Sequence, residues 1–272
     1  MEISDMSQRR YLMESDQEAL RLDMKTDESI VEEQALWAGI APGTRVADLG
    51  CGSGKTTFVL NRLVQPEGES VGIDFSDQRI DFAGTNYTDQ GLSFHCRDIR
   101  DELDGFGTFD FVWIRFVLEY YRAESRDLVR RISRMLKPGG TLCLIDLDFN
   151  CMIHSGLSPR LETTLLGAIA TLERETNFDP YVGRKLYSYL FDLDYKEIDV
   201  QMQAHNLIFG DPSEKDLFNW AKKIDLIKDL PGIRFDAYGG EKEVFFRELN
   251  EFVNDPRRFT YTPLIACRGR KP

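Results

Sequence analysis

Residues 46–54 read VADLGCGSG, a short apolar run that ends in three glycines at every second position. The run Arg45–Leu49 predicts a buried strand, and the pattern of Thr56–Val64 predicts a helix soon after it. Glycines between a strand and a helix allow a tight turn and a close approach of the backbone to a ligand, and the helix adds unpaired N–H groups at its start. The stretch therefore predicts a ligand-binding turn in an α/β domain.

The alternation of strand, turn and helix continues beyond this loop. Further strands are predicted at short apolar runs, namely Ser70–Asp74, Leu92–Cys96, Phe109–Ile114 and Thr141–Leu147. A helix is expected from about Asp77, and another over Ser125–Leu136 that stops at Lys137–Gly140. Apolar strands that alternate with amphipathic helices are typical of a parallel sheet covered on both faces. With right-handed crossovers, this pattern predicts a doubly wound, Rossmann-like α/β fold.

The N-terminal residues 1–44 read as a helical lid. Ser15 and Glu18 stand at capping-box spacing, and a second helix is expected over about Ser29–Trp37. The main domain is then expected to cover residues 45–272.

The C-terminal half is expected to insert cap helices into this domain at about 150–195 and 211–256. The runs Ile198–Phe209 and Arg258–Cys267 bring the expected sheet to seven strands. Proline cannot donate to a strand ladder, so Pro263 predicts that the last strand starts just after it or bulges there.

Length and composition restrict the class of protein. A chain of 272 residues with 42% hydrophobic residues is an ordinary globular chain of one large domain or somewhat more. The formal net charge of -12 argues against binding to nucleic-acid phosphates or to an anionic membrane surface. No apolar run reaches the ~18 residues that span a bilayer. A small-molecule partner is therefore favoured, with a monomer or a homodimer as the expected state.

The five cysteines show no CxxC spacing, so neither a disulfide framework nor a four-cysteine zinc site is expected, and no metal is implied. Free thiols are typical of a reducing compartment. The N-terminal MEISDMSQRR lacks the apolar segment of a secretory signal. A cytoplasmic protein is the expectation.

Two other kinds of phosphate-binding loop can be tested by spacing. A Walker loop needs GxxxxGK[ST], but Leu49 stands where the first glycine is required. A dinucleotide fingerprint needs GxGxxG, but Lys55 stands in place of the third glycine. A P-loop ATPase and a nicotinamide oxidoreductase are therefore disfavoured alternatives.

Acidic residues follow the next two strands. Asp74 ends its strand 20 positions after Gly54, where doubly wound folds place an acid on ribose hydroxyls. Asp98 follows the third strand, where its carboxylate would accept a hydrogen bond from an adenine amino group and Ile99 would pack on the ring. A nucleoside is therefore the expected ligand.

Four segments in order resemble the motifs of one family. Residues 46–54 (VADLGCGSG), 71–76 (VGIDFS), 109–113 (FDFVW) and 136–142 (LKPGGTL) are similar to the motifs of class I S-adenosylmethionine-dependent methyltransferases, in their small-molecule, UbiE-like branch. The resemblance covers roughly residues 40–150. It implies S-adenosyl-L-methionine as cofactor and S-adenosyl-L-homocysteine as product.

The resemblance also implies a role for each matching position. The glycine loop would place its backbone against the methionine and ribose parts of the cofactor, and Asp74 would bind the ribose hydroxyls. Arg115 lies where the family places a residue near the methionine moiety, although an arginine is unusual there. The implied cofactor residues of the core are Asp48, Gly50, Cys51, Gly52, Gly54, Asp74, Phe75, Asp98, Ile99 and Arg115. Of these, Asp48 would help to hold the cofactor's amino group.

The N-terminal segment that contains Tyr11 and Arg21 looks like the lid of this branch. Either side chain would close over the cofactor carboxylate, since an arginine fork matches a carboxylate. The alternative is that Tyr11 packs in the lid and Arg21 pairs with nearby acids.

Methyl transfer from a sulfonium mainly requires that the protein align the acceptor, the methyl group and the sulfur and exclude water. An oxygen or nitrogen acceptor is favoured over carbon, and His154 after the fifth strand is the candidate base, with Asp146 and Asp148 as rivals. The alternative function is a non-catalytic protein with a methyltransferase fold that binds the cofactor or a partner.

Overall fold

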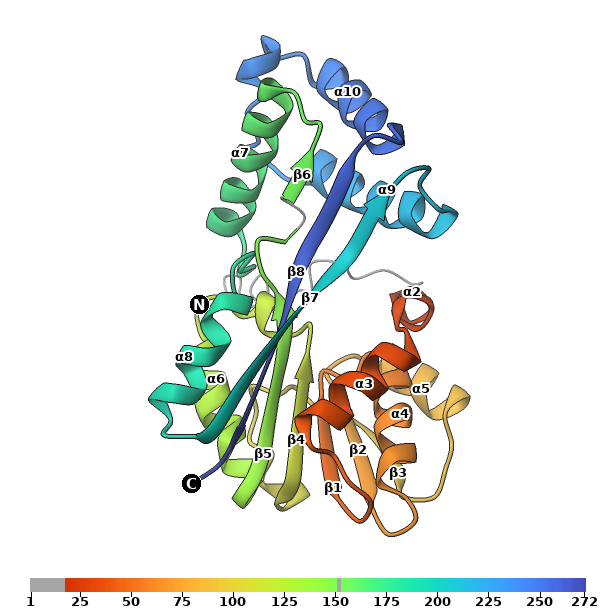
Figure 1. Cartoon of the computed structure of the whole chain (residues 1–272), viewed down its shortest axis with the longest axis vertical. Coiled ribbons are helices and arrows are strands. Elements are labelled where there is room, and N and C mark those ends of the chain that lie inside the picture. Colours follow the sequence, from red (N-terminus) through yellow and green to blue (C-terminus); the bar gives the residue numbers. More distant parts are fainter. Residues whose placement is uncertain (1–17, 151–152) are drawn as a thin grey trace. The chain divides into compact units, whose positions relative to one another are not determined.

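The computed structural model describes residues 18–150 and 153–272 (Figure 1). The chain forms two compact units. The sheet unit contains residues 18–146, Arg184–Gln201 and Ile265–Pro272. The helical unit contains the described residues of Leu147–Gly183 together with Met202–Leu264.

The centre of the sheet unit is a parallel sheet. Its strands are β1 (Arg45–Leu49), β2 (Glu69–Asp74), β3 (Leu92–Cys96), β4 (Phe109–Arg115) and β5 (Leu136–Leu147). They lie in the order β3-β2-β1-β4-β5, and each neighbouring pair is parallel. The order reverses between β1 and β4, so the carboxyl ends of these strands open onto the crevice where α/β sheets bind ligands.

The expected α/β class is confirmed, but the strand number differs from seven. The sheet continues from β5 to β8 (Phe259–Arg270) and β6 (Ile153–Ser155), while β7 (Lys196–Phe209) pairs with β8, which makes eight strands among the described residues. The additional strand is β6, whose three residues pair antiparallel with the start of β8. So short a strand has no recognisable pattern in the sequence.

Helices of the sheet unit begin where the sequence supplies caps. They are α2 (Glu18–Lys25), α3 (Glu28–Ala38), α4 (Lys55–Val64), α5 (Asp77–Asn86), α6 (Ser125–Ile132) and α8 (Leu186–Asp192). Asp27 and Ser76 accept hydrogen bonds from the first-turn N–H groups of α3 and α5. The apolar residues of β4, among them the fully buried Phe111 and Trp113, form the centre of the core.

The helical unit has an apolar core of its own. Its helices are α7 (Pro159–Glu175), α9 (Glu214–Asp229) and α10 (Lys242–Asn254), and α9 starts with a capping box of Ser213 and Asp216. Buried side chains from these helices, including Leu161, Trp220 and Phe245, pack together. Among the described residues, no helix is both long and apolar enough to cross a membrane.

The expected start of β5 is wrong, and one of the two alternatives for the last strand is excluded. β5 begins at Leu136 instead of Thr141, because the C-terminal chain pairs with the predicted turn: Gly139 N–H donates to Lys271 and Lys271 N–H donates to Gly140. β8 runs through Pro263 instead of starting after it. Proline lacks a donor but keeps its carbonyl, which accepts the N–H of Asp148 at 2.9 Å.

Arg258 in the helical unit is an unpaired buried cation. It is 2% exposed, and its Nε and both terminal nitrogens have no hydrogen-bond partner among the described residues. Burial lowers the pKa of Arg258, whereas the carboxylates of Asp216 and Asp255 raise it. Replacement of a poorly compensated buried charge by an apolar chain of similar length is often stabilising.

We therefore expect Arg258→Met to increase the free energy of unfolding by about 2 kcal/mol in urea denaturation. The matched control is Arg257→Met, since the Arg257 side chain is 88% exposed and its removal should change stability by less than about 0.5 kcal/mol. A loss of stability in Arg258→Met alone would show that this guanidinium stabilises the unit.

Candidate functional site

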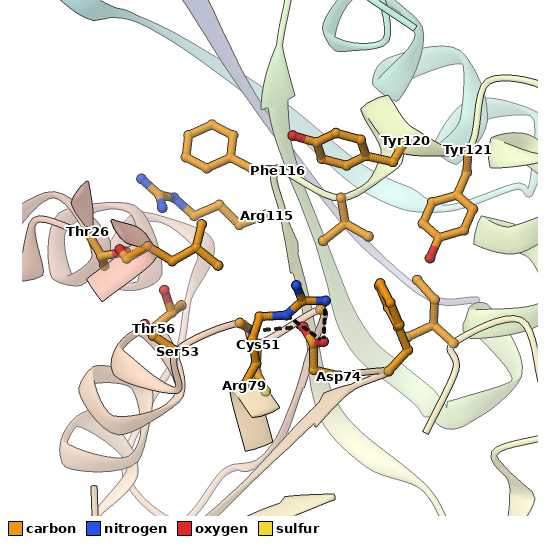
Figure 2. A pocket seen from close by; sticks show the side chains of 16 residues that line it. Thr26, Cys51, Ser53, Thr56, Asp74, Arg79, Arg115, Phe116, Tyr120 and Tyr121 are labelled. Carbon is orange, nitrogen blue, oxygen red and sulfur yellow. Dashed lines mark hydrogen bonds and ion pairs between the residues drawn. The ribbon is translucent and has the colours of Figure 1, made fainter. Parts of the chain in front are cut away.

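A cavity opens at the carboxyl ends of the central strands in the sheet unit. Figure 2 shows the 16 residues that line it, which come from α2, the glycine loop, the start of α4, the end of β2 and the following α5, the segment after β3, and the end of β4 with the segment after it. They are Leu22, Thr26, Gly50, Cys51, Gly52, Ser53, Thr56, Asp74, Phe75, Arg79, Ile99, Arg115, Phe116, Val117, Tyr120 and Tyr121. All of them belong to one unit, so the site can be described by itself.

The glycine loop forms the floor of this cavity. Its three glycines have positive φ angles, and the N–H groups of Gly50 and Cys51 both donate to the carbonyl of Ile73 at the end of β2. Cys51 is buried, and burial raises the pKa of its thiol well above the usual range, so it remains a neutral lining group. The backbone is thereby exposed to the cavity in a conformation suited to glycine.

Gly54 ends the loop and caps α4. Its φ is +84°, and an added Cβ would lie 2.6 Å from the Cβ of Ala83 in α5. Ala83 has no flexible end that could move aside.

Gly54→Ala should therefore lower the free energy of unfolding by about 2 kcal/mol in chemical denaturation. Gly84→Ala is the control, because Gly84 lies in α5 and an added Cβ meets no atom within 4 Å. That variant should be neutral or slightly stabilising. Equal effects of the two substitutions would disprove the steric argument.

Asp48 lies beneath the loop, and it is not among the side chains that line the cavity. Its carboxylate is 2% exposed and accepts a hydrogen bond from the Thr57 hydroxyl at 2.7 Å. Burial raises the pKa of Asp48 to about 7, against the lowering effects of Thr57 and of the Arg115 charge. The expected direct role of Asp48 in holding an amino group stays a prediction.

Asp74 reaches into the cavity from the end of β2 and is held by three groups. Its Oδ2 accepts the Gly52 N–H at 3.0 Å, and its Oδ1 accepts the Ser76 N–H at 3.0 Å. The guanidinium of Arg79 donates to the same Oδ1 through Nε at 3.0 Å and a terminal nitrogen at 2.9 Å, as the dashed lines in Figure 2 indicate. The sequence analysis did not identify Arg79, although an arginine one turn into the helix after Asp74 was a usable signal.

Arg115 is the main cationic group on the opposite side of the cavity. Its Nε donates to Gln34 Oε1 at 3.2 Å, and its guanidinium lies 4.2 Å from the Phe116 ring centroid. Burial lowers the pKa of Arg115 to about 10, while the charges of Asp48, Asp146 and Asp27 raise it. Phe116 has a φ of +58°, a conformation that non-glycine residues adopt rarely and often at functional sites. An anionic ligand group would complete the environment of this arginine.

The other end of the cavity is apolar and aromatic. Phe75, Ile99 and Tyr121 line it, so Ile99, which was expected to pack on adenine, and Phe75, which the resemblance places near adenine, are both present in the lining. Asp98 is not part of it, because Arg100 donates to both carboxylate oxygens of Asp98 at 2.5–3.0 Å. The predicted hydrogen bond from adenine to Asp98 therefore competes with an ion pair that the sequence analysis did not anticipate.

The predictions for the two lid residues, Tyr11 and Arg21, are tested to different extents. Tyr11 lies outside the described residues. Arg21 does not line the cavity. It donates to the Glu18 carboxylate at 2.6 and 2.7 Å, which agrees with the alternative prediction that Arg21 pairs with a nearby acid. Leu22 and Thr26 of the same helix α2 line the cavity in its place.

The candidate base His154 belongs to the helical unit, within which its ring packs. Its Nδ1 lies 2.9 Å from the Thr260 hydroxyl, and Trp220 and Phe252 contact the ring. Its role as a base stays a prediction. Of its rivals, Asp146 is fully buried and accepts the N–H of Glu119 at 3.2 Å. The described residues contain no cluster of ligands suited to a metal ion.

Comparison with known proteins identifies the family. Residues 40–187 match the sequence profile described as "Methyltransferase domain". The ubiquinone/menaquinone biosynthesis C-methyltransferase UbiE of Ectopseudomonas mendocina is 29% identical over 115 residues, which are 41% of this chain and 44% of that protein. The carboxy-S-adenosyl-L-methionine synthase of Shewanella amazonensis is 32% identical over 39% of this chain and 45% of that protein.

These alignments span less than half the length of the curated relatives. Among solved structures, phosphoethanolamine N-methyltransferase 2 of Haemonchus contortus, in complex with S-adenosyl-L-methionine, superimposes with a TM-score of 0.58. The identity is 15%, with 98% of this chain and 59% of that chain covered, so this likeness concerns the fold. Because the profile matches more than half of its residues, the chain belongs to the methyltransferase domain family, the class I fold that uses S-adenosylmethionine as methyl donor.

Proposed function

We propose that this protein transfers a methyl group from S-adenosylmethionine to a small organic acceptor. The observation that carries the proposal is the composition of one cavity, which combines the glycine loop, Asp74 and the partly buried Arg115. The alternative of a non-catalytic binding protein would use the same cavity, so binding and turnover must be measured separately.

The chemistry of the lining fits the cofactor. Asp74 offers a carboxylate oxygen to ribose hydroxyls, and Phe75 and Ile99 offer apolar surface to adenine. Arg115 offers unused donors to the methionine carboxylate, since Gln34 satisfies only its Nε among the described contacts. The bound cofactor supplies an activated methyl group, and these side chains orient it and exclude water from the reacting atoms.

For the acceptor, we propose a small molecule with an oxygen or nitrogen nucleophile. The net charge of -12 argues against a nucleic-acid acceptor. The name of the UbiE relative includes C-methyltransferase, so activated carbon acceptors belong in the same screen.

The test is calorimetric titration with S-adenosylmethionine and S-adenosylhomocysteine, followed by methyl transfer to a panel of phenols, amines and enols. We expect micromolar binding, at least about tenfold weaker in Asp74→Ala because a charged hydrogen-bond acceptor for the ribose is lost. Turnover of any panel member supports the enzyme. Binding without turnover across the panel supports the non-catalytic alternative, and absence of binding by folded protein contradicts the cofactor site.

A further inference from the structure

The two oxygens of the Asp74 carboxylate receive different numbers of donors. A carboxylate has about four lone-pair directions, two on each oxygen. Oδ1 receives three donors, namely the Ser76 N–H and two nitrogens of Arg79, all at 2.9–3.0 Å. Oδ2 receives one donor, the Gly52 N–H at 3.0 Å. One oxygen is therefore saturated, while the other keeps one direction for a ligand.

Arg79 is fixed in the position that saturates Oδ1. It is 3% exposed and lies in the first turn of α5, so its backbone is held by the same helix start that Ser76 caps. Its guanidinium lies 4.7 Å from the Phe75 ring centroid, a cation–π contact on the adenine side of the cavity. Release of Asp74 by Arg79 would separate two buried opposite charges, which is strongly unfavourable. The ion pair is therefore expected to persist when a ligand binds.

We propose that Arg79 is a positioning residue that makes Asp74 hold the cofactor ribose through a single oxygen, Oδ2. This inference rests on the proposed cofactor site. It predicts that the two ribose hydroxyls contribute unequally to binding: the one that reaches Oδ2 carries the hydrogen bond to Asp74, and the other gains little from this residue. An Asp74 without Arg79 would offer both oxygens and would hold both hydroxyls.

The experiment compares dissociation constants of S-adenosylhomocysteine with those of its 2′-deoxy and 3′-deoxy analogues. In the wild type, one analogue should bind at least about tenfold more weakly than the parent, while the other stays within about threefold. In Arg79→Met, both analogues should bind at least about fivefold more weakly than the parent, because Oδ1 becomes available. Arg130→Met serves as control, since Arg130 pairs with Asp127 on the exposed face of α6, and it should keep the wild-type pattern.

The outcomes separate the inference from the proposed function. No binding of S-adenosylhomocysteine by the wild type contradicts the cofactor site itself. Binding with equal losses for the two analogues in the wild type overturns the role of Arg79, and this test needs no folded variant. An asymmetry that persists unchanged in Arg79→Met also overturns it, since the cause would then lie elsewhere in the cavity.

Discussion

As the pH rises from about 5 to about 8, the protein should bind S-adenosylmethionine more tightly and yet become less stable. The reason is that Asp48 loses its proton at about pH 7. The ordinary pKa of this carboxyl is 3.8, and burial raises it in the folded protein. A group whose pKa is raised on folding binds its proton more tightly in the folded state. Its contribution to stability is complete below the ordinary pKa and is lost as the pH rises through the folded value.

The size of this effect is large for one residue. A change of pKa from 3.8 to about 7 corresponds to about 4 kcal/mol of stability, of which about 3 kcal/mol is lost above pH 5. Other carboxyls also titrate at the acid end, so the informative quantity is the difference from Asp48→Asn. That variant keeps an oxygen that accepts the Thr57 hydroxyl but carries no charge. Its stability advantage over the wild type should grow by about 3 kcal/mol between about pH 5 and pH 8.

Cofactor binding should respond in the opposite direction. In the proposed binding mode, the sulfonium and ammonium groups of the cofactor would lie close to the loop above Asp48, so its positive charges would favour the ionised carboxyl. Below about pH 7 the wild type should lose up to about tenfold in affinity per pH unit, measured by calorimetry, whereas Asp48→Asn should show a flat profile. Parallel profiles of the two proteins, in stability or in affinity, would contradict the assignment of this pKa to Asp48.

Arg115→Met should weaken S-adenosylhomocysteine binding by about 100-fold, which is about 3 kcal/mol. The physical reason is the loss of a charged partner for the methionine carboxylate inside a water-poor cavity. 5′-Methylthioadenosine lacks the amino-acid part of the cofactor, so its affinity should change by less than about threefold. The measurement belongs at about pH 8, because Arg115 lowers the pKa of Asp48 and its removal raises that pKa further.

The control for this prediction is Arg126→Met, since Arg126 pairs with Asp192 at the exposed surface of the sheet unit. It should leave both affinities unchanged. An equal loss for the two ligands in Arg115→Met would show that the side chain shapes the cavity as a whole. If neither ligand loses affinity, the methionine carboxylate of the cofactor binds away from Arg115.

Local sequence patterns determined the order of the central strands and helices. The apolar runs that predicted β1, β2 and β4 are mostly buried, whereas β3 at the edge is only partly buried, and such runs can be recognised without knowledge of their neighbours. The glycine spacing likewise predicted the loop below the cavity, because positive φ angles there exclude most other residues. Asp74 and Ile99 were selected as site residues by their places after strands, Phe75 and Arg115 by the family resemblance, and all four line the cavity.

Only the tertiary structure decided which charges meet. Arg79 pairs with Asp74, Arg100 with Asp98 and Arg21 with Glu18, and each pairing changes what the predicted site residue can offer to a ligand. The partners lie within five residues of each other, so the sequence offers them as possible pairs, but which pairs form depends on rotamers and on the burial of both partners. The pKa of Asp48 has the same origin: the strand places the carboxyl under the loop, and the surrounding core removes the water that would otherwise keep it acidic.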